Sequence, residues 1–246
     1  MTAFFSYIKP AVHVRCPDPF FTTIIMTTLT TRNEIVETNK IIASELAKMQ
    51  KACYDEVTLK FYREDSEEQV YLEQFDCIQY EELQYETHNK VIGLNHPDLD
   101  TFIPVLTDKL TALFQTIHAR RFYILSHLKM DFFGNRGNTF KPLVNAYGKL
   151  EKMTGKSSYK EAFRIDISEL SDFLEIVFWL TRCDPGVPEF IFLFDEDEKI
   201  QINLCQYGNI HLTEFENEQL TKEIVSSLGW TIIEEQESDS FTTSEQ

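Results

Sequence analysis

Residues 134–139 carry the side chains in this sequence that are best suited to binding an anion. The two glycines of this segment let a ligand approach the backbone, and its arginine supplies a positive charge. The segment lies between a predicted strand and a predicted helix, and the amino end of a helix attracts negative charge. The candidate anion-binding residues are Asn135, Arg136 and Asn138. The simpler interpretation is an ordinary turn in which an asparagine caps the helix.

His127, Lys129 and Asp131 alternate along a predicted strand and therefore share one face of it. A histidine beside a carboxylate could act as a general acid or base. A half-exposed strand produces the same polar face without catalysis, and we favour that interpretation. The histidines lack the spacing of a metal site, and the chain has no serine-hydrolase or thiol-enzyme motif. We therefore predict no catalytic residue, no metal site and no cofactor.

Two acidic runs offer a different chemistry, the recognition of a basic surface. One run lies between two strongly predicted strands, as the tip of a hairpin, and the other lies in a predicted turn. Carboxylates at such turns either keep a loop solvated and discourage strand pairing, or contact a basic partner. The candidate partner-binding residues are Asp65, Glu67, Glu68, Asp195, Glu196, Asp197 and Glu198.

The overall charge excludes several kinds of partner. The chain has 40 acidic and 23 basic residues, a net charge of -17. Such a surface repels phosphate backbones and anionic headgroups, so we expect neither nucleic acid nor membrane as a partner. Five dispersed cysteines without a CxxC pair predict free thiols in a reducing compartment. We therefore expect a cytoplasmic protein.

The two ends of the chain differ from its middle. Residues 1–25 contain three prolines and no periodicity, and Met26 offers a second start, so we expect a disordered or dispensable extension. Residues 234–246 contain five acids and no base, which predicts a solvated, disordered tail. The remaining residues, 26–233, retain most of the negative charge and are expected to form a single domain, with a candidate seam near 118–121.

Hydrophobic periodicity predicts the elements of that domain. Helices are expected over residues 34–53, 97–117, 140–153, 168–183 and 216–228. Strands are expected over residues 57–62, 70–78, 122–133, 163–167, 190–194, 200–204, 210–212 and 230–233. The order α-β-β-α-β-α-β-α-β-β-β-α-β predicts an α/β fold with α+β character, in which helices flank a mixed sheet.

Strong acidity on one α/β domain without a catalytic motif predicts a non-catalytic protein-binding protein. Bacterial immunity proteins, which neutralise a basic toxin or nuclease by binding it, have this general composition and architecture. We therefore expect an inhibitor of that kind, with a basic protein as its partner and an oligomeric state that the sequence leaves open. The alternatives are a nucleotide- or anion-binding enzyme that uses residues 134–139, and a regulatory or scaffold subunit.

Overall fold

The computed structural model describes residues 27–234 together with Glu237 and Phe241. Within these residues, eight strands form one sheet in the order β1-β4-β3-β5-β6-β7-β2-β8, and all of its pairings are antiparallel. The strands are β1 (Thr28–Thr30), β2 (Thr87–Gly93), β3 (Arg121–Ser126), β4 (Ala162–Asp166), β5 (Ile191–Asp195), β6 (Ile200–Leu204), β7 (Ile210–Phe215) and β8 (Thr231–Ile232). The extension predicted over residues 1–25 lies outside the described residues.

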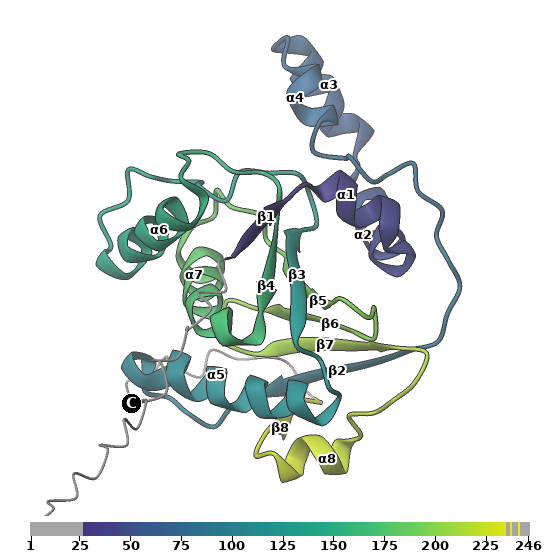
Figure 1. Ribbon diagram of the computed structural model, residues 1–246. Coiled ribbons are helices and arrows are strands. Elements are labelled where there is room, and N and C mark those ends of the chain that lie inside the picture. The colour runs from purple at the N-terminus through teal and green to yellow at the C-terminus, as the bar shows by residue number, and fades with distance from the viewer. Residues whose placement is uncertain (1–26, 235–236, 238–240, 242–246) are drawn as a thin grey trace, which may run out of the picture.

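Helices cover both faces of this sheet (Figure 1). They are α1 (Arg32–Thr38), α2 (Lys40–Cys53), α3 (Glu56–Glu64), α4 (Glu68–Leu72), α5 (Leu99–Thr116), α6 (Lys141–Thr154), α7 (Leu170–Cys183) and α8 (Lys222–Ser227), with a short 3-10 turn η1 (Ile167–Glu169) before α7. The predicted class, helices packed against a sheet, is confirmed, and the strand directions are antiparallel rather than mixed.

Strand β5 separates two hydrophobic cores. Because side chains alternate along a strand, Phe192 and Phe194 pack in the core that α1 and α2 cover. Ile191 and Leu193 pack in the larger core with α5, α6 and α7. All five residues of β5 are buried, which agrees with the continuous apolar run that predicted a central strand.

Several predicted elements need correction. Residues 57–62 and most of 70–78 were expected as two strands. They form helix α3, the end of α4 and the turns that follow. The carboxylate of Asp55 caps α3 by accepting hydrogen bonds from the backbone N–H groups of Val57 and Thr58, at 3.2 and 2.8 Å. This cap and the packing of α3 on α4 outweigh the alternating pattern.

Other differences concern element boundaries. The helix expected over 34–53 is two helices that meet at Asn39, and the strand expected over 122–133 ends at Ser126. Strand β2 was not predicted because its first four residues, Thr87 to Lys90, are all polar and show no apolar alternation. The candidate seam near 118–121 is the turn from α5 into β3, a strand in the interior of the sheet.

Candidate functional site

A pair of short helices projects from the body of the protein (Figure 1). This α3–α4 arm comprises residues 54–75. Its two helices pack through a small aromatic core, in which the ring of Tyr71 lies 5.0 Å from that of Tyr62 and 4.9 Å from that of Phe75. The hydroxyl of Tyr71 also accepts a hydrogen bond from the backbone N–H of Asp55, at 2.9 Å. The arm is therefore an ordered structure with its own core.

An ion pair between a buried arginine and a partly buried aspartate fixes the base of the arm to the body. The guanidinium of Arg32, on α1, is fully buried and contacts the carboxylate of Asp76 at 2.7 and 3.0 Å. Gln50, on α2, donates to the same carboxylate at 2.9 Å and accepts from the backbone N–H of Cys77 at 2.7 Å. Burial alone would raise the pKa of Asp76, but the hydrogen bonds and charge of Arg32 outweigh it and lower that pKa.

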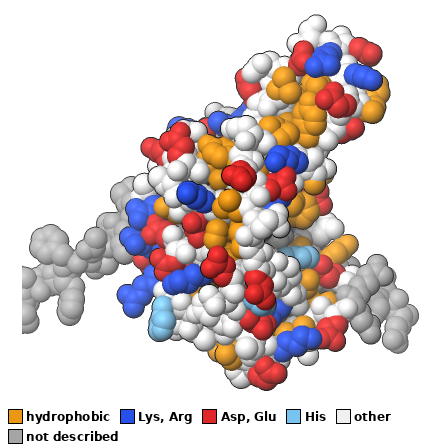
Figure 2. Space-filling view, turned by 90° about the vertical axis from the view of Figure 1, so that its right-hand side faces the viewer, with side chains coloured by type: hydrophobic (Ala, Val, Ile, Leu, Met, Phe, Trp, Pro, Cys, Tyr) orange, Lys and Arg blue, Asp and Glu red, His pale blue; other side chains and the backbone are white. Residues whose placement is uncertain are grey.

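The surface of the arm combines apolar and acidic side chains. Phe61 is 62% exposed and Val57, one helical turn earlier on α3, is 58% exposed. The other exposed large apolar residues of the described arm are Val70 and Leu72. Within residues 54–75 there are seven acidic and two basic residues. In Figure 2 the arm is at the top, with hydrophobic side chains among charged ones.

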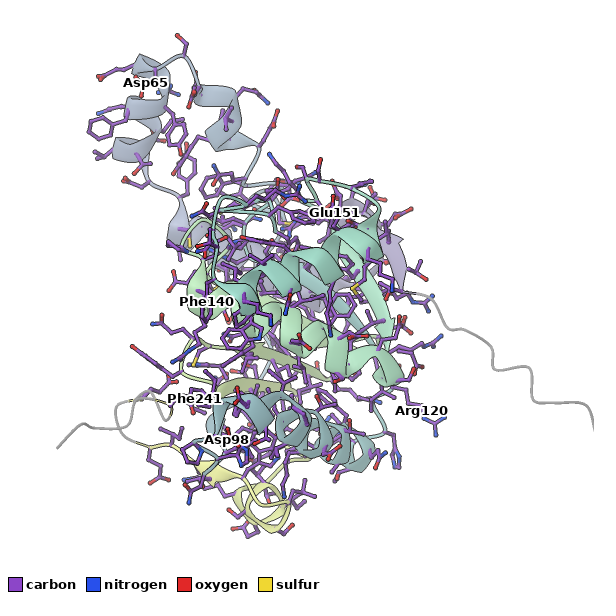
Figure 3. The ribbon with its side chains drawn as sticks, turned by 90° about the vertical axis from the view of Figure 1, so that its left-hand side faces the viewer. Asp65, Asp98, Arg120, Phe140, Glu151 and Phe241 are labelled. Carbon is purple, nitrogen blue, oxygen red and sulfur yellow. The ribbon has the colours of Figure 1, made fainter. Side chains whose placement is uncertain are left out.

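The three acidic residues predicted at 65–68 lie at the outer end of this arm. Asp65 follows the last residue of α3, and Figure 3 labels it at the tip. Glu67 directly precedes α4, and Glu68 forms an ion pair with Arg63 at 2.6 Å. The turn expected between two strands is thus a turn between two helices, and Asp65 and Glu67 are exposed in it.

The second acidic run, the hairpin between β5 and β6, is engaged mainly with the protein itself. Asp195 is buried and accepts hydrogen bonds from the backbone N–H groups of Lys199 and Ile200 at 2.7 and 2.8 Å. Burial raises the pKa of this carboxylate. Glu196 forms ion pairs with Arg121, at 2.7 Å, and with Arg164. The carboxylates of Asp195 and Glu196 are therefore occupied by contacts within the protein.

The last two carboxylates of that run differ from each other. Glu198 has a positive φ of 55° and accepts hydrogen bonds from the backbone N–H groups of Ile41 and Ile42, at 2.7 and 3.2 Å. It therefore caps the amino end of α2 from a distant part of the chain. Asp197 is exposed and pairs with Lys199 at 2.7 Å. The two acidic runs lie apart, one on the arm and one on the body.

The candidate anion-binding loop is an exposed turn whose polar groups are engaged by other residues of the chain. The backbone N–H of Asn135 donates to the buried carboxylate of Asp184 at 2.7 Å, so an acceptor already occupies it. Arg136 stacks over Phe133, with the guanidinium carbon 4.2 Å from the ring centre. Asn138 accepts from the backbone N–H of Phe140 at 2.8 Å. This geometry favours an ordinary turn. The expected cap by an asparagine is not formed, because the N-cap of α6 is Phe140, whose side chain makes no capping hydrogen bond.

His127, Lys129 and Asp131 are not neighbours on one strand face, because β3 ends before them. His127 is buried and bonds to the backbone of Phe190, and burial lowers its pKa. Lys129 pairs with Glu161 at 3.0 Å. Asp131 accepts backbone hydrogen bonds, including one of 2.9 Å from Tyr159. Each of these residues therefore holds loops of the body in place.

A third group of residues went unnoticed in the sequence. Cys205, His211 and Glu237 place a thiol, an imidazole and a carboxylate within 4.8 Å of one another. They line a pocket of about 450 Å³ beside the turn between β6 and β7. Burial, with a smaller contribution from Glu237, raises the pKa of Cys205 to about 11, so the sulfur is protonated at neutral pH. That protonation argues against a thiolate nucleophile.

Comparison with known proteins gives no relative from which a function could be transferred. No family model, no curated protein and no solved structure matches this chain. In the part of the chain that the structure describes, no helix has both the length and the apolar character needed to cross a bilayer. The described residues offer two features that bear on function, the α3–α4 arm and the pocket at Cys205, His211 and Glu237.

Proposed function

We propose that this protein binds a basic protein through the α3–α4 arm. The observation that carries the proposal is Phe61, which is 62% exposed on a projecting segment with seven acidic residues and two basic ones. Protein interfaces concentrate their affinity in exposed aromatic side chains surrounded by a polar rim. The carboxylates of the rim attract a positive partner and repel other acidic proteins.

The chemistry of the arm favours one kind of occupant. A second copy of this chain would bring another net charge of -17 to an already acidic surface, so self-association through the arm is disfavoured. A toxin or nuclease has a positively charged surface for its own substrate. A projecting pair of helices with an apolar centre and acidic tip suits such a surface, and its binding there would block the substrate. We therefore propose an inhibitor of the immunity-protein type.

The ordered attachment of the arm also supports a binding role. Arg32 and Gln50 fix Asp76 and the chain that follows it, so the arm needs little reorganisation before binding. An interface element that is ordered in advance loses less conformational entropy when it binds. The ion pair of Arg32 and Asp76 thus serves binding indirectly, by fixing the base of the arm.

Site-specific photocrosslinking tests the proposal in the native host. A photoreactive phenylalanine analogue replaces Phe61 in one variant and Phe140 in a matched control, because Phe140 is also exposed (47%) but lies on the body (Figure 3). We expect adducts from position 61 to a protein of net positive charge, and none to that protein from position 140. The purified pair should bind more weakly as salt is raised.

Three results would overturn the proposal. One is the absence of any protein adduct at position 61, and another is the same adducts from both positions. The third is a captured protein whose affinity for the purified chain does not respond to salt. An adduct between two copies of this chain would identify the arm as a self-association surface instead.

A further inference from the structure

The turn between β6 and β7 brings two good metal ligands together. Asn203 on β6 pairs in register with His211 on β7, and Cys205 lies just past the end of β6. The turn is closed by a hydrogen bond of 2.9 Å from the N–H of Cys205 to the carbonyl of Asn209. Antiparallel pairing therefore places a thiol and an imidazole side by side although five residues separate them in the sequence.

The carboxylate of Glu237 completes the group from a distant part of the chain. One of its oxygens lies 3.1 Å from Nε2 of His211, and the other accepts from Sγ of Cys205 at 3.3 Å. The side-chain amide of Asn209 donates to that second oxygen at 2.9 Å and so orients the carboxylate. Nearby, Phe241 packs on Phe102 with ring centres 4.7 Å apart. The segment that was expected to be solvated thus contacts the body at both of these residues.

We propose that Cys205, His211 and Glu237 bind a single zinc ion, a site independent of the arm and its partner. Ligands at about 2.0–2.3 Å from a tetrahedral zinc stand about 3.3–3.6 Å from one another. The contacts of 3.1 and 3.3 Å are already close to that spacing, and all three ligand atoms lie within 4.8 Å. Small side-chain movements around the ion are enough to complete the coordination.

The donor set selects the kind of ion. Thiolate, imidazole and carboxylate together suit zinc, whereas calcium and magnesium prefer oxygen ligands alone. When the sulfur binds, its proton passes to solvent and the sulfur–zinc bond takes its place. The carboxylate oxygen of Glu237 that accepted the hydrogen bond from Cys205 then becomes a metal ligand beside the sulfur. The side-chain amide of Asn209 orients this oxygen.

The arrangement fits a metal site better than a catalytic triad. In a thiol triad the imidazole contacts the sulfur directly, so that it can take the proton. Here the carboxylate of Glu237 contacts both the sulfur of Cys205 and the imidazole of His211. An ion placed among the three atoms uses all of them at once.

Three protein ligands leave the fourth position of a tetrahedral zinc ion open. The pocket of about 450 Å³ lies at the three ligands and is also lined by Tyr207 and Asn203. A water molecule or a small ligand in that pocket can therefore complete the coordination. Metal binding would also tie the segment that contains Glu237 to the turn between β6 and β7.

Titration of the reduced full-length chain with Co²⁺, followed by competition with Zn²⁺, tests this site. We expect one ion per chain, a near-ultraviolet band from thiolate–cobalt charge transfer, and the visible bands of tetrahedral Co²⁺. Cys205→Ser should abolish the charge-transfer band, and Cys53→Ser, at an exposed cysteine of α2, should retain it. Loss of a group that merely orients a ligand weakens metal binding about 10- to 100-fold, so His211→Gln and Glu237→Gln should weaken it by at least that factor.

Thermal unfolding gives a second readout that does not depend on the cobalt spectrum. Saturating Zn²⁺ should raise the Tm of the wild-type chain and leave the Tm of Glu237→Gln almost unchanged. The proposal is overturned if no thiolate band forms in the wild type, or if the band persists in Cys205→Ser. Wild-type affinity in Glu237→Gln would also contradict it, because the site would then lack its third ligand.

Discussion

The guanidinium of Arg32 and the carboxylate of Asp76 form a two-point ion pair, at 2.7 and 3.0 Å, that joins α1 to the base of the α3–α4 arm. Arg32 also donates to the backbone carbonyl of Ser126 at 2.6 Å, at the end of β3. One buried side chain therefore connects the first helix, the sheet and the projecting arm. The position of the arm depends on this contact.

Removing the carboxylate should destabilise the fold strongly. In Asp76→Ala the guanidinium of Arg32 remains fully buried without its counter-charge, and breaking such a pair typically costs about 3–5 kcal/mol. Urea unfolding measures the loss. The exposed pair between Lys51 and Glu82 is the matched control, and Glu82→Ala should cost less than about 1 kcal/mol. Equal losses in the two variants would contradict the anchoring role of Asp76.

The same pair predicts a dependence of stability on acid pH. The folded-state pKa of Asp76 is lowered, so its contribution is present above the unfolded-state pKa of about 3.9 and is lost as the pH falls toward the lowered value. The free energy of unfolding of the wild type should therefore approach that of Asp76→Asn below about pH 4. Unfolding curves at several pH values measure this difference. If the difference in unfolding free energy between the wild type and Asp76→Asn stayed constant down to pH 2, the lowered pKa of Asp76 would be refuted.

Glu198 should matter for stability although it belongs to an acidic run at the surface. Its carboxylate caps α2 through Ile41 and Ile42, and loss of a helix cap costs about 1 kcal/mol. Thermal or urea unfolding of Glu198→Ala should show that loss. Asp197→Ala, which removes only an exposed pair with Lys199, should change stability by less than about 0.5 kcal/mol. A larger loss of stability in Asp197→Ala than in Glu198→Ala would contradict the role of Glu198 as the cap of α2.

Two glycines should respond to alanine in opposite directions. A Cβ at Gly134 would lie 2.6 Å from a backbone carbon of Gly186, so Gly134→Ala should cost about 1–3 kcal/mol through overpacking. A Cβ at Gly148, within α6, meets nothing within 4 Å, and Gly148→Ala should stabilise the protein by about 0.5–1 kcal/mol. Denaturant midpoints measure both changes. A neutral Gly134→Ala would mean that the loop does not need this close approach.

Much of the body could be predicted from the sequence. The apolar stripe of α5 and the apolar run of β5 encode their elements locally. The glycine at 155, in the left-handed conformation, marks the end of α6. The arm could not be predicted in this way, because Val57, Leu59 and Phe61 alternate as in a strand. In α3 this spacing buries only Leu59 and leaves the other two exposed. Asp55, two residues before Val57, was the signal for a helix start.

The roles of the acidic residues depend on contacts between distant parts of the chain. Nothing near Glu198 in the sequence indicates that it caps a helix more than 150 residues earlier. Cys205 and His211 meet only because β6 and β7 pair across a tight turn, and Glu237 joins them from a segment without periodicity. Local patterns of charge therefore located acidic surfaces, but only the tertiary structure distinguishes the exposed carboxylates of the arm from those that hold the fold together.

The affinity of the basic partner for two alanine variants tests the central claim most directly. Titration calorimetry would compare Phe61→Ala, on the arm, with Phe140→Ala, an equally large exposed side chain on the body. An aromatic residue at the centre of an interface contributes about 2 kcal/mol or more, so Phe61→Ala should weaken binding by about 30-fold or more. Phe140→Ala should leave the affinity within about twofold of wild type. Unchanged binding by Phe61→Ala, or an equal loss in both variants, would contradict recognition through the arm.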